Sequence, residues 1–207
     1  VVKIELPEVG DSARGYGPFP GDVPDREKSG LFLYLGINKQ SVTLDPGTTA
    51  GLELFLKLAS KTDVLLESQA PGEMARLGLD YPTLKGINPR LVYVSITPYG
   101  QVGPKAGWKA RHVNSFHASG EGFTLPGGAT FAAFPDRAPV AGGAHLGEYD
   151  AGLTAASGAV AALFAQEIWG VGQHVDVSKQ ESTLGLNRLT LTEARAAGTV
   201  TNRTRSY

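Results

Sequence analysis

Short apolar runs recur along the chain, and each is bounded by glycine, proline or charged residues. They are VVKIEL at 1–6, SVTL at 41–44, DVLLE at 63–67, LVYVSIT at 91–97 and GQHVDVS at 172–178. Runs of this length, rich in β-branched residues, are typical of strands that are buried in a parallel sheet. We therefore predict five such strands.

Segments with helical spacing separate these strands. Leu52, Phe55 and Leu58 recur on one face of a helix after the second strand. Asp45 is its expected N-cap and Pro46 its first residue. Further helices are predicted over 113–121, 149–169 and 179–198. Strands that alternate with helices predict an α/β fold, a doubly wound parallel sheet with helices on both faces.

Two segments rich in glycine and proline are predicted to be loops, 11–29 and 125–143. The second is too apolar for a disordered linker, and a loop of this length inside a domain usually serves function. We expect it to be a flap beside the ligand.

Composition points to a small-molecule ligand. The net charge is −1 with both signs interspersed, which provides no general attraction for nucleic acid or an anionic membrane. The absence of cysteine fits a cytoplasmic protein. No apolar run approaches the roughly 18 to 20 residues that span a bilayer. The histidines predict no metal site, because His112 and His117 do not share a helical face and no cysteine supports them.

The loop after the fourth strand carries candidate ligand-binding residues. Ligands of open α/β sheets bind beyond the carboxyl ends of the strands. This loop contains Lys105, Trp108, Lys109, Arg111 and His112. Cations hold phosphates and an aromatic ring stacks on a purine, but an ordinary solvated loop has the same composition. Both interpretations stay open at this point.

Two carboxylates, Glu148 and Asp150, precede a run of small residues that predicts a slim helix over 151–164. Acidic residues are favoured at a helix N-terminus, so helix capping accounts for either of them. A carboxylate at this position, beside a long flap, is also suited to act as a nucleophile in acyl transfer.

Longer motifs connect the chain to a known family. They are VVKIE, INKQSVTLD, DVLLESQAPGEMARLGLDYPTL, INPRLVYVSITPYGQVGP, HASGEG and EYDAGLTAASGAVAALFAQEIWGVGQHVDVSKQES. In this order they resemble the family III coenzyme A transferases of the CaiB/BaiF type. This group contains formyl-CoA and carnitine-CoA transferases and α-methylacyl-CoA racemases, and the resemblance covers nearly the whole chain.

The resemblance implies a Rossmann-like large domain in a dimer of interlocked, ring-like protomers. Residues 1–197 would form part of that domain, and 198–207 would begin a linker towards a small domain that this chain does not contain. A first strand with its helix and a returning C-terminal segment would also be missing, so we expect sequence before Val1. The implied partner is a second copy or a catalytic homologue.

The resemblance also implies a reaction. An aspartate carboxylate attacks the acyl-CoA thioester and forms a mixed anhydride. CoA thiolate then attacks the anhydride and gives an enzyme thioester. An incoming acid carries out the same two steps in reverse order and leaves as the new acyl-CoA. That aspartate stands four residues before a glycine, which here is Gly152, so Glu148 occupies its position. Three interpretations compete: Glu148 is the nucleophile, Asp150 has replaced it, or the chain is a catalytically silent CoA-binding subunit.

A racemase is a minor alternative. The His–Asp pair of that branch aligns with Arg111 and His112, so a histidine is present one place late and the aspartate is absent. His112 would then be a general base facing Glu148.

CoA or acyl-CoA would be a substrate, with no permanently bound cofactor. Lys109 matches a lysine that contacts CoA in the formyl-CoA transferase type, and Arg111 belongs to the same basic loop. Arg76 matches an arginine of the family, and Leu44 a residue that lines the adenine pocket. Ser68, Gln69 and Ala70 replace a family Asn-Phe-Arg, so the aromatic ring and the charge are absent, while backbone contacts to the nucleotide could survive the change.

Overall fold

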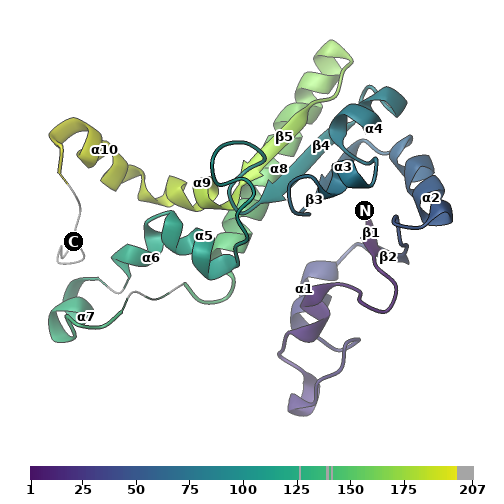
Figure 1. The fold of residues 1–207 in the computed structure, drawn as a ribbon. Coiled ribbons are helices and arrows are strands. Elements are labelled where there is room, and N and C mark those ends of the chain that lie inside the picture. Colours follow the sequence, from purple (N-terminus) through teal and green to yellow (C-terminus); the bar gives the residue numbers. More distant parts are fainter. Residues whose placement is uncertain (126, 139, 141, 200–207) are drawn as a thin grey trace. The chain divides into compact units, whose positions relative to one another are not determined.

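The chain divides into two units, residues 1–60 and residues 61–207 (Figure 1). A computed structural model describes residues 1–125, 127–138, 140 and 142–199. Each unit has its own parallel sheet and its own helices. The strands predicted as one set are therefore distributed over two sheets.

The first unit is built on two parallel strands, β1 (Val2–Glu5) and β2 (Gln40–Thr43), with Val2 opposite Gln40 and Glu5 opposite Thr43. The connection contains 3₁₀ turns at Ser12–Gly15 and Pro20–Asp22 and the helix α1 (Gly30–Gly36). The sequence pattern did not predict α1. Its residues are GLFLYLG, apolar on every side, so no amphipathic period marks it.

The helix α2 (Thr49–Ala59) begins later than predicted. Its N-cap is Thr48, whose hydroxyl accepts a hydrogen bond from the Gly51 backbone N–H at 3.1 Å. The prediction of Asp45 as the cap is wrong, because the Asp45 carboxylate accepts from the Gly47 N–H at 2.8 Å and closes a turn before the helix. Pro46 lies in that turn.

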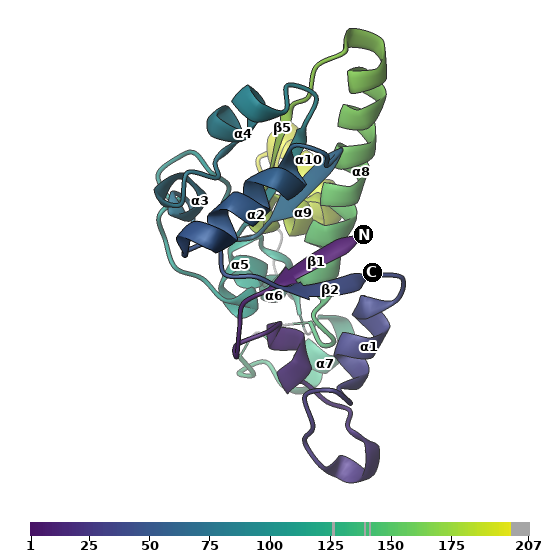
Figure 2. The same ribbon diagram turned by 90° about the vertical axis from the view of Figure 1, so that its right-hand side faces the viewer.

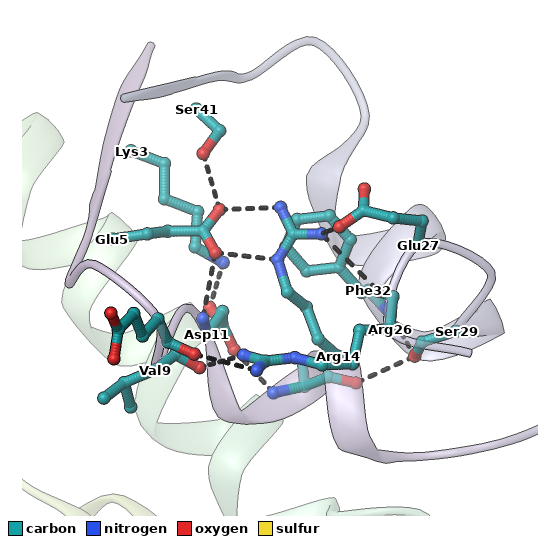
Figure 3. A network of polar contacts seen from close by, with 12 residues as sticks. Lys3, Glu5, Val9, Asp11, Arg14, Arg26, Glu27, Ser29, Phe32 and Ser41 are labelled. Atoms are coloured by element: carbon teal, nitrogen blue, oxygen red, sulfur yellow. Dashed lines mark hydrogen bonds and ion pairs between the residues drawn. The ribbon is translucent and has the colours of Figure 1, made fainter. Parts of the chain in front are cut away.

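A polar network holds the first unit together around Glu5, which is only 5% exposed (Figure 3). Arg14 donates to both of its oxygens, at 2.7 and 3.1 Å, and Ser41 donates at 2.6 Å. The Asp11 backbone N–H also donates to it. The Arg14 guanidinium stacks 3.8 Å from the centroid of the Phe32 ring. These bonds, led by those from Arg14, lower the pKa of Glu5 from 4.5 to about 2.

The second unit contains three parallel strands, β3 (Val64–Glu67), β4 (Val92–Thr97) and β5 (His174–Ser178), with β4 in the centre. Val64 lies opposite Val92, and Thr97 lies opposite Ser178. The three parallel strands confirm the predicted α/β class.

Helices cover both faces of this sheet, as Figure 2 shows. On one face, α8 (Leu146–Trp169) buries the alanines Ala155, Ala159 and Ala162 against strand valines, and the small side chains permit close approach. On the other face, the Tyr93 hydroxyl donates to the Leu79 carbonyl at 3.2 Å. The Tyr93 ring also lies 6.0 Å from that of Tyr81, which opens α4 (Tyr81–Ile87). The doubly wound arrangement is confirmed.

The remaining helices surround the carboxyl ends of the strands or lead away from them. They are α3 (Glu73–Arg76), α5 (His112–Ala118), α6 (Glu121–Thr124), α7 (Gly128–Ala133), α9 (Lys179–Leu184) and α10 (Arg188–Ala197). The predicted loop over 125–143 therefore contains a helix, α7. Residues 126, 139 and 141 of that segment and 200–207 of the predicted linker lie outside the described residues.

The outer face of α8 is apolar and exposed at Leu153, Val160 and Phe164. By length and composition, α8 qualifies as a membrane-spanning helix, whereas the sequence pattern had indicated no apolar run of spanning length. A core helix of a soluble protein passes the same test. The alanine face that α8 packs on the sheet is what a core helix presents.

Candidate active site

The start of α8 is set by an unusual turn. Ala144 and His145 both have positive φ, 54° and 60°, a conformation that disfavours side chains other than glycine, asparagine and aspartate. His145 is the N-cap, and its carbonyl accepts from the Glu148 N–H at 2.9 Å. Glu148 is therefore the third residue of the helix and Asp150 the fifth. Neither carboxylate is the cap, and the predicted start at Tyr149 is three residues late.

Glu148 is held by a lysine that the sequence analysis missed. The Lys179 ammonium donates to Glu148 Oε2 at 2.5 Å, and the two side chains are 21% and 35% exposed respectively. Lys179 is the first residue of α9, immediately beyond the carboxyl end of β5. Its place at the edge where α/β proteins bind ligands was the signal available in the sequence.

A third helix reaches the same point through His112, the first residue of α5. A Cβ added to Gly147 would lie 3.1 Å from His112 Cε1 and 3.1 Å from Thr183 Oγ1. Gly147 thus allows the starts of α5 and α8 and the side of α9 to meet closely. Within the described chain, His112 Nε2 is buried and has no hydrogen-bond partner. The structure therefore brings His112 beside the residue that precedes Glu148.

Asp150 has different surroundings. Two positions along an α-helix turn a side chain by about 200°, so it points away from Glu148. Its Oδ2 is buried and has no hydrogen-bond partner in the part of the chain that the structure describes. Lys179 forms its ion pair with Glu148 and not with Asp150.

The predicted basic and aromatic loop follows β4, and Lys105 contacts two aromatic rings in it. The Lys105 ammonium lies 5.9 Å from the centroid of the Tyr99 ring and 5.7 Å from that of Trp108. The two rings meet edge to face at 6.2 Å. Trp108 is 59% exposed. Sequence reasoning missed the contribution of Tyr99.

Lys109 and Arg111 are exposed in the continuation of this loop. Arg111 is the N-cap residue of α5, and its backbone N–H donates to Asn114 Oδ1 at 2.9 Å, so its guanidinium is not required for capping. Farther back, the Gln101 N–H donates to Asp176 Oδ2 at 2.8 Å. This bond fastens the loop to β5, near the strand end that precedes Lys179.

The other predicted CoA contacts are spread more widely. Ser68 and Gln69 are exposed directly after β3, and the Gln69 N–H donates to Glu67 Oε2 at 2.6 Å. Arg76 ends α3, pairs with Glu73 at 3.0 Å and is exposed. Leu44 is buried after β2 and belongs to the first unit, so it is described apart from the others.

The fold and this site define a class of protein. It is a doubly wound α/β domain with a helix-terminal carboxylate and a basic, aromatic loop beyond the carboxyl ends of its strands. Residues 1–206 match the family described as CoA-transferase family III, and the chain belongs to that family. The resemblance read from its motifs is confirmed.

Curated relatives carry related names. The chain is 38% identical over 191 residues to a formyl-CoA:oxalate CoA-transferase of Streptomyces avermitilis, covering 92% of this chain and 44% of the relative. It is 37% identical over 184 residues to an acetyl-CoA:oxalate CoA-transferase of Acetobacter aceti, covering 88% and 44%. The chain thus spans less than half the length of these relatives.

Solved structures agree on the fold. A CaiB/BaiF family protein from Brucella suis superimposes with a TM-score of 0.83 at 30% identity, covering 98% of this chain and 52% of that one. A protein from Mycobacterium tuberculosis, Rv3272, gives a TM-score of 0.75 at 28% identity, covering 95% and 52%. The 207 residues are therefore a partial domain of this fold.

Proposed function

We propose that the protein is a CoA-transferase that moves coenzyme A from an acyl-CoA to a carboxylic acid, with Glu148 as the accepting carboxylate. The observation that carries this proposal is the surroundings of Glu148. It lies in the first turn of α8, partly exposed and fixed by Lys179 at 2.5 Å. Unsatisfied N–H groups at a helix start favour an anionic group there, which suits a carboxylate nucleophile.

The reaction proceeds through two carbonyl exchanges on this side chain. Glu148 attacks the thioester carbonyl, expels CoA thiolate and forms a mixed anhydride. The thiolate then attacks the glutamyl carbonyl and releases the donor acid. The acceptor carboxylate attacks the resulting glutamyl-CoA thioester, expels CoA thiolate and forms a second mixed anhydride. The thiolate then attacks the carbonyl of the acceptor, which gives the new acyl-CoA and releases the Glu148 carboxylate. Each exchange conserves charge and needs no other reagent.

The CoA portion is proposed to bind beyond the ends of β3 and β4. Lys109 and Arg111 are exposed cations suited to its phosphates, and the exposed face of Trp108 is suited to its adenine. Arg76 would add a further cation. Ser68 and Gln69 would offer backbone contacts after β3.

The relatives' names support oxalate, or a similar short acid, as one substrate, and formyl-CoA or acetyl-CoA as the donor. An interlocked dimer of two copies and a cytoplasmic location belong to the same proposal. Membership of the family supports both.

Trapping the intermediate tests the nucleophile. The full-length protein is incubated with acyl-CoA, treated with hydroxylamine or borohydride, digested and analysed by peptide mass spectrometry. Modification at Glu148, lost in Glu148→Gln, is the expected result. Modification confined to Asp150 would overturn the assignment, and CoA binding without any modification would favour the silent subunit.

The minor racemase alternative rests on one observation. His112 Nε2 is buried beside Gly147 and has no hydrogen-bond partner among the residues that the structure describes. It has its own test. Deuterium exchange at the α-carbon of a branched acyl-CoA in D₂O, lost in His112→Gln, would support it. The absence of exchange in a protein that forms the thioester would exclude it.

A further inference from the structure

We propose that Lys179 binds the carboxylate of the acceptor acid, and so holds two carboxylates in turn during one catalytic cycle. It holds Glu148 in the resting enzyme and the acceptor once Glu148 carries CoA. This inference rests on the proposed function, since it concerns the same site. It deepens that function by assigning the residue that recruits the second substrate.

The position of Lys179 is not explained by the stability of its own helix. A cation at the first residue of a helix opposes the helix dipole and is disfavoured there. Capping of α9 is carried out by Ser178, whose hydroxyl accepts from the Glu181 N–H at 3.2 Å. Among the described residues, the ion-pair partner of Lys179 is Glu148. The lysine therefore serves the carboxylate site.

The charge of this pair changes during the reaction. The resting pair is one cation and one anion, both partly withdrawn from water. Once Glu148 is a thioester and the donor acid has left, the side chain of Glu148 carries no negative charge, and the ammonium has lost the counter-ion that it has in the resting enzyme. An unpaired charge at a partly buried position is unfavourable. The thioester form of the enzyme therefore favours binding of an anion beside Lys179. The next step of the reaction needs an anion at this place, namely the carboxylate of the acceptor acid.

The geometry puts that carboxylate within reach. An attacking oxygen must approach the glutamyl carbonyl carbon to about 3–3.5 Å. The Lys179 ammonium lies 2.5 Å from an oxygen bonded to that same carbon. An acceptor that attacks from the side of Lys179 can therefore place an oxygen close enough to accept a hydrogen bond from the ammonium. One cation can serve both carboxylates because they occupy neighbouring positions at different times.

The backbone of Lys179 is fixed, so that the ammonium cannot follow a distant ligand. The Thr183 hydroxyl donates to the Lys179 carbonyl at 3.0 Å. The next residue, Gln180, donates its backbone N–H to the Pro98 carbonyl at 3.1 Å, which joins α9 to the loop after β4. From this fixed backbone the side chain reaches the start of α8, where its ammonium meets Glu148.

The test is the steady-state kinetics of the full-length protein with Lys179→Met, Lys179→Gln and Lys179→Arg. Lys61→Met, the same change at an exposed lysine of the second unit, is the matched control. Loss of a charge-assisted hydrogen bond predicts a KM for the acid raised on the order of 10- to 100-fold in Lys179→Met. The KM for acyl-CoA should change by less than about threefold. Arginine should restore most of the acid affinity.

Product inhibition supplies a second readout. The acid released from the donor leaves from the same position, so its inhibition constant should rise by a similar factor in Lys179→Met. A lower kcat with an unchanged acid KM in both Lys179→Met and Lys179→Gln would overturn the proposal, since Lys179 would then only orient Glu148. Near-normal kinetics in all three variants would also overturn it.

Failure of the underlying function has a different signature. If Glu148→Gln retains full transfer activity, Glu148 is not the nucleophile, whatever the Lys179 variants do. If Glu148→Gln is inactive and Lys179→Met keeps its acid KM, only the present inference is wrong. Thermal unfolding of each variant identifies losses of activity that arise from misfolding. Lys179→Gln retains a polar side chain if Lys179→Met does not fold.

Discussion

Replacing Glu148 by aspartate gives the residue that the family resemblance implies at this position, yet we expect it to impair this protein. The change withdraws the carboxylate by up to about 1.5 Å, one carbon–carbon bond. The 2.5 Å contact between Lys179 Nζ and Glu148 Oε2 would lengthen to about 4 Å, beyond hydrogen-bond range. A misplacement of about 1 Å can cost on the order of a hundredfold in rate.

The predicted result is a kcat/KM lowered on the order of 10- to 100-fold, measured by transfer from acyl-CoA to acid in the full-length protein. The same change at the exposed Glu53, Glu53→Asp, is the control and should leave the rate unaltered. A Glu148→Asp variant as fast as the parent, or faster, would refute the reasoning. The site would then be built for aspartate, and Lys179 would not be adjusted to the longer side chain.

Three further predictions concern stability and the neighbouring carboxylate. Because the pKa of Glu5 is lowered from 4.5 to about 2, its stabilising contribution is complete above about pH 4.5 and is lost as the pH falls towards 2. About 3 kcal/mol of unfolding free energy should disappear over that range in denaturant titrations, and Glu5→Gln should abolish this dependence. Gly172→Ala should destabilise the second unit by at least about 2 kcal/mol, because the added Cβ would lie 1.9 Å from the Leu91 carbonyl oxygen. An unchanged free energy of unfolding in urea would contradict this. Asp150→Asn should keep activity within about twofold and not lower the melting temperature, since Asp150 Oδ2 is buried without a hydrogen-bond partner among the described residues and asparagine has nearly the same shape. A loss of activity beyond tenfold would make Asp150 the nucleophile.

Much of the fold could be predicted because burial determines it. Val92 and Val94 face α8, while Tyr93 between them faces α4. Because both faces of β4 are covered, its successive residues are apolar, and this continuous apolar run predicts a buried parallel strand. The ends of helices were less predictable, because neighbouring residues of similar chemistry can each cap the helix or close a turn before it. Asp45 closes a turn while Thr48 caps α2, and both residue types suit either task.

The site was only partly predictable for a different reason. Glu148 could be found from its position before Gly152, which is local in the sequence. Lys179 is 31 residues away and meets Glu148 only because β5 and α8 pack together. The close approach of His112 depends on Gly147, one glycine among 27, and no pattern distinguishes it. Contacts between distant elements require the folded chain.

The central claim is that the Glu148 carboxylate forms covalent bonds to both acyl groups. It is tested most directly by a single turnover of the full-length enzyme thioester with an acceptor acid whose carboxylate carries ¹⁸O. The mechanism transfers one acceptor oxygen to the enzyme carboxylate when the new acyl-CoA is released. The account predicts ¹⁸O in the peptide that contains Glu148, localised to that residue by fragmentation. Formation of product with the label at Asp150, or with no label in the protein, would contradict it.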